Sequence, residues 1–104
     1  MKIEVYLTAF AREGEPVKVR PVLIPDETPE SEMLETVFYL GQNEFQPVDG
    51  CYSVSAGDVV KLPDGSLHRV AMAGFEALPA DTDTASLPIG MEAQFPNVRR
   101  RAPA

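Results

Sequence analysis

The sequence has no tryptophan, one cysteine, one histidine and no long apolar run. A single cysteine, Cys51, cannot form an internal disulfide or a thiolate metal cluster. Zinc sites need three or four cysteine, histidine or carboxylate ligands at defined spacing, and the chain shows no such spacing. No stretch approaches the ~20 apolar residues that span a bilayer. We therefore expect no metal, no cofactor and no membrane partner.

Basic residues are also few. The 104 residues include 9 Lys and Arg against 16 Asp and Glu, which gives a net charge of −7. Three of the basic residues are Arg99, Arg100 and Arg101, so residues 1–98 hold 6 basic and 16 acidic residues and carry −10. Affinity for phosphates depends on Lys and Arg. We therefore expect no direct nucleic-acid binding except through the arginine run, for which a solvated tail is the simpler interpretation.

The length corresponds to a single domain with a shallow core. The opening residues, MKIEVYLTAF, alternate between apolar and polar positions and do not form the apolar core of a signal peptide. We expect a cytoplasmic location.

The first part of the chain predicts a β-hairpin. Residues 2–10 place apolar side chains at every second position, as in a half-buried strand. A turn at residues 13–16 is followed by a β-rich run over 17–24, which contains Pro21. Because proline removes one ladder donor, this second strand is expected to be an edge strand or to break at Pro21.

Residues 26–43 predict the one clear helix. Thr28 is expected to cap its first turn, Pro29 to occupy the first helical position and Gly41 to adopt the left-handed conformation past its end. The acidic residues between Asp26 and Glu35 complement the helix dipole, so this cluster has a structural interpretation. An apolar stripe at helical spacing is expected to lie on the sheet: Met33, Leu34, Val37, Phe38 and Leu40.

The second half of the chain predicts a loop over 43–58 and a hairpin over 59–72, with a turn at 63–66. Together these elements predict an α+β domain over residues 1–78. We expect a small curved antiparallel sheet of about four to five strands, similar to a partial barrel, with one helix packed on it. Residues 79–104 are proline-rich and predict an extended or partly ordered tail. The tail has isolated apolar residues that can pack on the domain or on a partner: Leu87, Ile89 and Phe95.

Cys51 and His68 are the only candidates for nucleophilic chemistry. A Cys–His pair needs contact between the two side chains and a third group that orients them, and no motif joins these two residues. The preferred interpretation is that Cys51 fills apolar space and that His68 is a polar residue on the outer face of the hairpin. We expect no enzyme and no catalytic residues, and an enzyme that uses either residue is the less favoured hypothesis.

Residues 53–78 contain the run Ser53-Val54-Ser55, then Asp58-Val59-Val60, a turn at Asp64-Gly65 and the pair Gly74-Phe75. This stretch resembles the YodL-like small domains found in accessory proteins of plasmids and integrative conjugative elements, with the best match over residues 36–78. The resemblance implies a bacterial mobile genetic element as the setting and a compact α+β form. It carries over no catalytic or binding residues.

Two functions fit these expectations. The first is a non-enzymatic binding or adaptor protein that acts through protein–protein contact, with the tail docking on a partner protein or on a second copy of the chain. The alternative is an acidic protein that imitates DNA, as some anti-restriction proteins do, because residues 1–98 carry −10.

Overall fold

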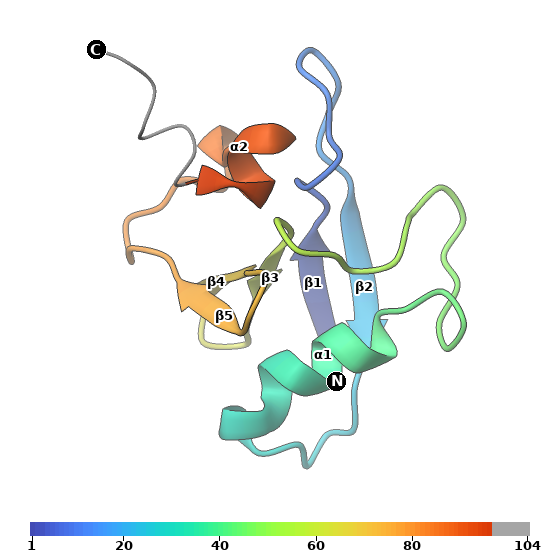
Figure 1. Ribbon diagram of the computed structural model, residues 1–104. Helices are drawn as coiled ribbons and strands as arrows, with labels where there is room; N and C mark the ends of the chain where they lie inside the picture. Colours follow the sequence, from blue (N-terminus) through green and yellow to red (C-terminus); the bar gives the residue numbers. More distant parts are fainter. Residues whose placement is uncertain (97–104) are drawn as a thin grey trace.

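The computed structural model describes residues 1–96 of the chain. Its centre is an antiparallel sheet in the order β2-β1-β3-β4-β5, open at both edges (Figure 1). The expected α+β fold, with an antiparallel sheet and one packed helix, is confirmed. The strands are β1 (Lys2–Tyr6), β2 (Val19–Leu23), β3 (Val59–Lys61), β4 (Leu67–Val70) and β5 (Phe75–Ala77).

Strand β2 is an edge strand, as Pro21 predicts. Leu7 donates to the Lys18 carbonyl and Ile24 donates to the Met1 carbonyl, both at 2.9 Å. Because antiparallel bonds alternate along a strand, Pro21 lies at a position whose backbone groups point away from β1. The missing N–H of this proline therefore costs the sheet no hydrogen bond.

The helix begins later than the sequence predicts. Helix α1 spans Met33–Leu40 and is preceded by the 3₁₀ turn η1, Glu30–Glu32. The predicted cap at Thr28 is wrong, because its hydroxyl donates to the Pro25 carbonyl at 2.7 Å and closes a local turn instead. Pro29 precedes η1 with an extended ψ of 143°.

Gly41 ends the helix, but in a different conformation from the one predicted. Its φ of −80° is not left-handed. A Cβ at this position would lie 2.5 Å from Val54 Cγ2 and 2.7 Å from the Val37 carbonyl oxygen. The glycine is therefore required by the close approach of loop 42–58 to the helix end, and not by a positive φ.

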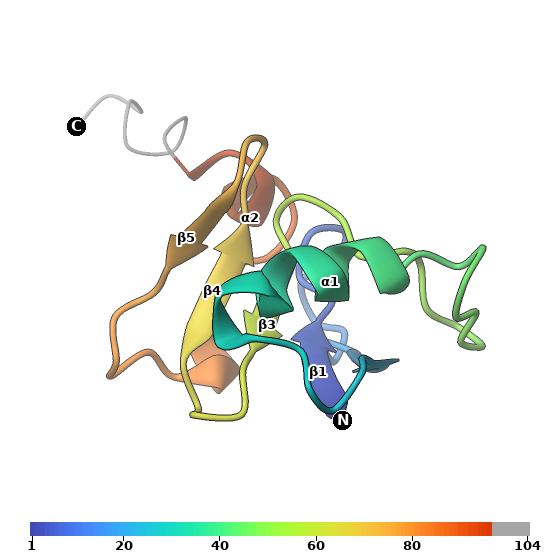
Figure 2. The same cartoon turned by 90° about the horizontal axis from the view of Figure 1, so that it is seen from below.

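Both faces of the sheet are covered. On one face α1 buries Met33 and Val37 against the main core, which includes Val5 and Val60 (Figure 2). On the other face Leu87 packs against Val59 and Leu67.

Leu87 belongs to residues 79–96, which contain the 3₁₀ turn η2 (Thr84–Ser86) and the short helix α2 (Met91–Gln94). Gly90 N donates to the Thr8 carbonyl at 2.9 Å, which ties this segment to the end of β1. Arg99, Arg100 and Arg101 lie outside the described residues. Within residues 1–96 no helix is long and apolar enough to cross a bilayer.

Gly41→Ala is expected to lower the free energy of unfolding by about 2–3 kcal/mol, because the added methyl overlaps both a side chain and a backbone oxygen. Chemical denaturation measures this loss. Gly14→Ala is the control, because no atom lies near the added methyl and the φ of this residue is +86°. Its only expected effect is the strain of a left-handed alanine, which lowers the free energy of unfolding by about 1 kcal/mol. A loss at Gly41 no larger than that at Gly14 contradicts the steric explanation.

Candidate functional site

Three polar residues are fully buried where loop 42–58 meets the sheet: Thr8, Arg20 and Asp58. Burying a polar group is costly unless it is hydrogen-bonded. The contacts of these residues therefore determine how the loop is held.

The carboxylate of Asp58 accepts hydrogen bonds from three residues, one after β1 and two in loop 42–58. Its Oδ1 accepts from Ala9 N at 2.9 Å and from the Tyr52 hydroxyl at 2.7 Å, and its Oδ2 accepts from Ser55 N at 2.9 Å. Next to it, the Thr8 hydroxyl donates to the Gly57 carbonyl at 2.5 Å. Burial raises the pKa of Asp58 above its usual 3.8, and the three donors partly oppose this rise.

Arg20 lies on β2 and its guanidinium points into loop 42–58. It donates to Asn43 Oδ1 at 2.7 Å, to the Tyr52 carbonyl at 2.6 Å and to the Gln46 carbonyl. Among the described residues 1–96 its buried Nε has no hydrogen-bond partner, and burial lowers the pKa of this arginine. One planar cation thus holds both ends of the loop, through acceptors that a guanidinium can reach simultaneously.

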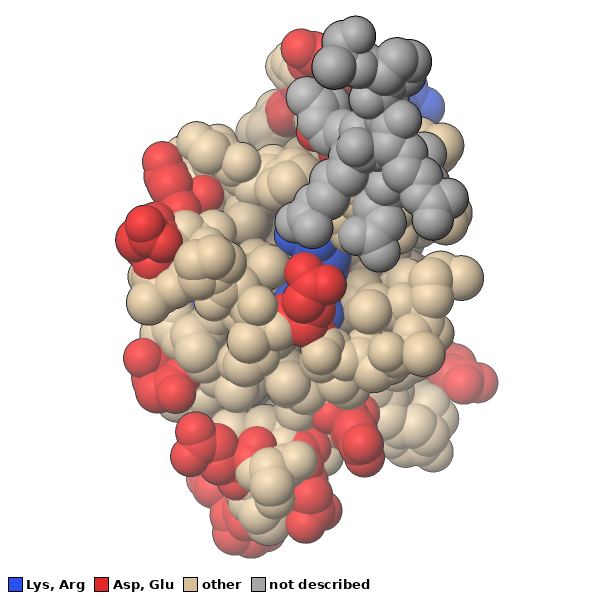
Figure 3. Space-filling model, turned by 60° about the vertical axis from the view of Figure 1, so that its left-hand side comes forward, with Lys and Arg blue, Asp and Glu red and all other residues tan. Residues whose placement is uncertain are grey.

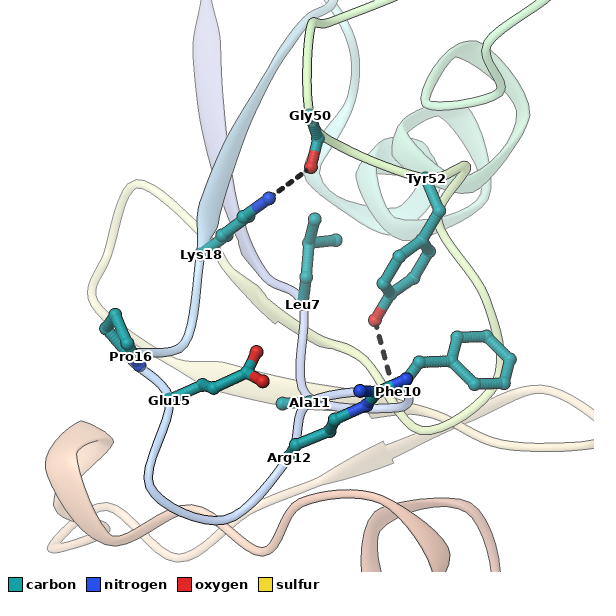
Figure 4. Close-up of a pocket in the computed structure, with 9 residues that line it drawn as sticks. All are labelled: Leu7, Phe10, Ala11, Arg12, Glu15, Pro16, Lys18, Gly50 and Tyr52. Carbon is teal, nitrogen blue, oxygen red and sulfur yellow. Dashed lines mark hydrogen bonds between the residues drawn. The ribbon is translucent and has the colours of Figure 1, made fainter.

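A hollow of about 180 Å³ lies between the β1–β2 connection and the loop residues Gly50 and Tyr52 (Figure 4). Tyr52 donates to Asp58 and accepts from Phe10 N at 3.3 Å, and Lys18 Nζ donates to the Gly50 carbonyl at 2.6 Å. Burial also raises the pKa of the Tyr52 hydroxyl, so it remains neutral. The hollow is below the ~300–1,000 Å³ of small-molecule sites.

The structure does not bring Cys51 and His68 together. Val60 pairs with both His68 and Val5, and Val5 pairs with Arg20 across the sheet. Cys51 precedes Tyr52, whose carbonyl binds the side chain of Arg20 on β2, whereas His68 lies on β4, three strands along the sheet from β2. Cys51 packs against the apolar core, as expected. The register places His68 on the same sheet face as Val60, so its predicted position on the outer face is wrong.

His68 belongs to a small polar cluster at the β3–β4 turn. Ser66 Oγ donates to Asp64 Oδ1 at 2.6 Å and lies 2.9 Å from His68 Nε2. Ser66 N also donates to Asp64 Oδ1 at 2.9 Å, and these bonds lower the pKa of Asp64. In a catalytic triad the histidine lies between serine and carboxylate and accepts the serine proton. Here the serine lies in the middle and its proton is held by Asp64, so the cluster closes the turn.

Within residues 1–96 no group of three or more His, Cys, Asp and Glu side chains is placed to hold a metal ion.

Exposed aromatic rings form the most distinctive surface of the protein. Tyr39 and Phe45 stack with their centroids 4.8 Å apart, although their side chains are 61% and 44% exposed. Phe38, which precedes Tyr39 in α1, is also exposed. The prediction that Phe38 lies on the sheet is therefore wrong. Glu35 lies three and four residues before these helical rings, on the same side of α1, and Glu44 adjoins Phe45 in the loop. We call Glu35, Phe38, Tyr39, Glu44 and Phe45 the aromatic-acidic face.

The charge around this face has one sign. Residues 21–60 contain 8 of the 16 acidic residues and no Lys, Arg or His. Every one of these acidic side chains except Asp58 is exposed. Figure 3 views the molecule from the side of β5 and shows Asp and Glu side chains scattered over this side and gathered at its lower end.

The sequence indicated only part of this arrangement. The acidic run over 26–35 was visible, but the pairing of Tyr39 with Phe45 joins a helix to a loop and has no local pattern. The burial of Arg20 was also hidden, because an arginine alternating with valines in an edge strand usually points to solvent.

Comparison of the chain with protein-family models, with curated protein sequences and with solved structures found no match. The resemblance to YodL-like domains stays a prediction.

Arg20→Lys is expected to lower the free energy of unfolding by about 2–4 kcal/mol, because one ammonium cannot satisfy three separate acceptors in a buried site. Thermal and urea unfolding measure this. The matched control is Lys18→Met, since Lys18 also donates to a loop carbonyl but is exposed, and its loss is expected to stay within about 0.5 kcal/mol. Equal losses in the two variants contradict the anchoring role of Arg20.

Tyr52→Phe removes one donor to Asp58 and is expected to cost about 1–2 kcal/mol at neutral pH. The folded protein binds the Asp58 proton at a higher pH than the unfolded chain does, so protonation of this group stabilises the fold as the pH falls through its raised pKa. The protonated carboxyl depends less on the phenol. The deficit of Tyr52→Phe relative to the natural protein is therefore expected to shrink as the pH falls.

Urea denaturation at several values between neutral pH and about pH 4 covers this range. Tyr39→Phe, at an exposed ring, controls for the loss of a hydroxyl. A deficit of Tyr52→Phe that is constant across the series would show that its donor role to Asp58 is wrong.

Proposed function

We propose that this protein is a non-enzymatic binding or adaptor module that docks on a basic protein surface through its aromatic-acidic face. The observation that carries the proposal is the exposed Tyr39–Phe45 stack inside a region of 40 residues without a basic side chain. Rings that are stacked but open to solvent keep apolar area available for a partner.

The rings supply the anchoring part of such an interface. Tyrosine is enriched among the residues that dominate binding energy, because it buries a large area with few rotatable bonds. Their stacking on each other reduces the freedom that binding has to remove. The faces of these rings also attract Arg and Lys side chains through cation–π contact.

The acidic side chains select the sign of the partner. Glu35 and Glu44 adjoin the rings, and a like-charged partner surface is repelled while a basic one is attracted and steered. The partner is therefore expected to present Arg or Lys together with apolar side chains.

A DNA-imitating inhibitor is the second candidate, because the same exposed carboxylates also suit a DNA-binding protein. The two candidates differ in what the partner's surface normally binds. If the carboxylates occupy the DNA-binding site of the partner, added duplex DNA competes with them and releases the partner. If they contact another surface of the partner, as an adaptor does, duplex DNA does not release it.

The bacterial mobile-element setting and the cytoplasmic location belong to this proposal. The setting rests on the resemblance over residues 36–78.

In the experiment the full chain is immobilised, and partner proteins are captured on it from a lysate of cells that produce this protein. Each captured protein is then purified and titrated by calorimetry against the natural protein and Tyr39→Ser/Phe45→Ser. The double substitution is expected to weaken binding at least about tenfold, since each anchoring ring contributes more than 1 kcal/mol in a typical hot spot. Higher salt is also expected to weaken binding to the natural protein.

Met91→Ser is the matched control, because Met91 is 70% exposed but lies on α2, away from the aromatic-acidic face. Affinity that is unchanged by the double substitution or insensitive to salt overturns the proposed face. Release by duplex DNA selects the DNA-imitating inhibitor.

A further inference from the structure

The two edges of the sheet differ in how they are protected. An edge strand presents unpaired N–H and C=O groups that can take up another strand, and proteins usually block them. In this protein β2 forms one edge and β5 forms the opposite one (Figure 1).

The β2 edge is blocked by residues of the chain itself. Of its outward positions, Pro21 has no N–H, and Leu23 has both backbone groups engaged by one side chain. Gln46 Oε1 accepts from Leu23 N at 2.9 Å, and Gln46 Nε2 donates to the Leu23 carbonyl at 2.7 Å. A carboxamide thus occupies the place that a neighbouring strand would take.

The β5 edge has no such cover within residues 1–96. Leu78 N donates to the Leu67 carbonyl, and Ala71 N donates to the Gly74 carbonyl. Because hydrogen-bonded pairs alternate along an antiparallel ladder, Glu76 and Arg69 form the hydrogen-bonded pair between these two. Phe75 and Ala77 therefore direct their N–H and C=O groups away from β4. None of these four groups has a hydrogen-bond partner in the described part of the chain.

An apolar groove of about 310 Å³ adjoins this edge, on the sheet face that carries Glu76. Met72 and Phe95, which are 78% and 39% exposed, lie along it. An open strand edge beside a pocket for alternate side chains is the arrangement that binds extended peptides by strand addition.

The charge at Glu76 indicates the kind of strand that fits. If a second copy paired through β5 in the register that uses all three residues, Glu76 would face Glu76 of that copy, and directly opposed like charges destabilise a sheet. Glu76 contacts Arg69 only at 3.4 Å and is 57% exposed, so its carboxylate remains accessible to another cation.

We infer that the β5 edge is a second binding site, which takes an antiparallel strand from a partner with the pattern basic–any–apolar. The basic side chain lies opposite Glu76. The residue two positions later lies opposite Gly74 on the same face, where it enters the groove between Met72 and Phe95.

The test uses the full chain carrying Tyr39→Ser/Phe45→Ser, so that it does not depend on the aromatic-acidic face. A displayed library of short random peptides is panned against this protein. The enriched peptides are then synthesised and titrated against it and against further variants. We expect peptides with the basic–any–apolar pattern.

Ala77→Pro removes an outward N–H without removing a bond to β4, and is expected to weaken peptide binding at least about tenfold. Ala77→Val keeps the N–H and is the matched control. Glu76→Lys is also expected to weaken binding about tenfold through like-charge contact. Bound peptide is expected to slow hydrogen exchange at the amides of Phe75 and Ala77, while the Leu78 amide is already protected by Leu67.

The inference is overturned if no peptide is enriched, if the enriched peptides bind Ala77→Pro as well as Ala77→Val, or if exchange slows elsewhere. The exchange result and Glu76→Lys decide the matter if Ala77→Pro does not fold. A negative result in this test does not bear on the proposed role of the aromatic-acidic face, because the protein used already carries Tyr39→Ser/Phe45→Ser.

Discussion

The buried carboxylate of Asp58 is the interaction on which the arrangement of the loops depends. It binds the backbone of Ala9 after β1, and it binds the side chain of Tyr52 and the backbone of Ser55 within loop 42–58, so it fixes this loop against the end of β1. These polar contacts hold loop 42–58 in place, and this loop carries Phe45 of the aromatic-acidic face. Breaking one of them exposes an unsatisfied buried group, which costs more than an ordinary hydrogen bond contributes.

Arg20 and Asp58 share the task without forming an ion pair. Arg20 binds the carbonyl of Tyr52 and Asp58 binds its hydroxyl, so the backbone and the ring of one residue are fixed from opposite sides. The groups that hydrogen-bond to each charge are dipoles, and the two charges also attract each other without direct contact. Loop 42–58 is long for a loop without regular structure, and these two residues explain how it stays ordered and why Phe45 can be held against Tyr39.

Local patterns predicted the strands, the helix and the edge position of Pro21, because alternation, helical spacing and proline act over a few residues. They failed where a distant segment decides the outcome. Gly41 is needed because Val54 approaches it from loop 42–58. Thr28 is a local failure: it has the residue type of a cap, but its hydroxyl donates to the carbonyl of Pro25, three residues before it. Arg20 in an edge strand looks like a surface residue until a later loop covers it. The site was therefore less predictable than the fold.

The contrast between the two sheet edges bears on the adaptor proposal. Gln46, which blocks the β2 edge, is the neighbour of Phe45 in the same loop, so one segment both closes that edge and builds the aromatic-acidic face. The loop thus closes an edge that could pair with another strand and presents beside it the surface that we propose binds a basic partner. The β5 edge lies at the other end of the sheet, and within residues 1–96 the N–H and C=O groups of Phe75 and Ala77 have no hydrogen-bond partner. On these two proposals, a partner bound at the aromatic-acidic face would leave the β5 edge free for a strand, as an adaptor that joins two proteins requires.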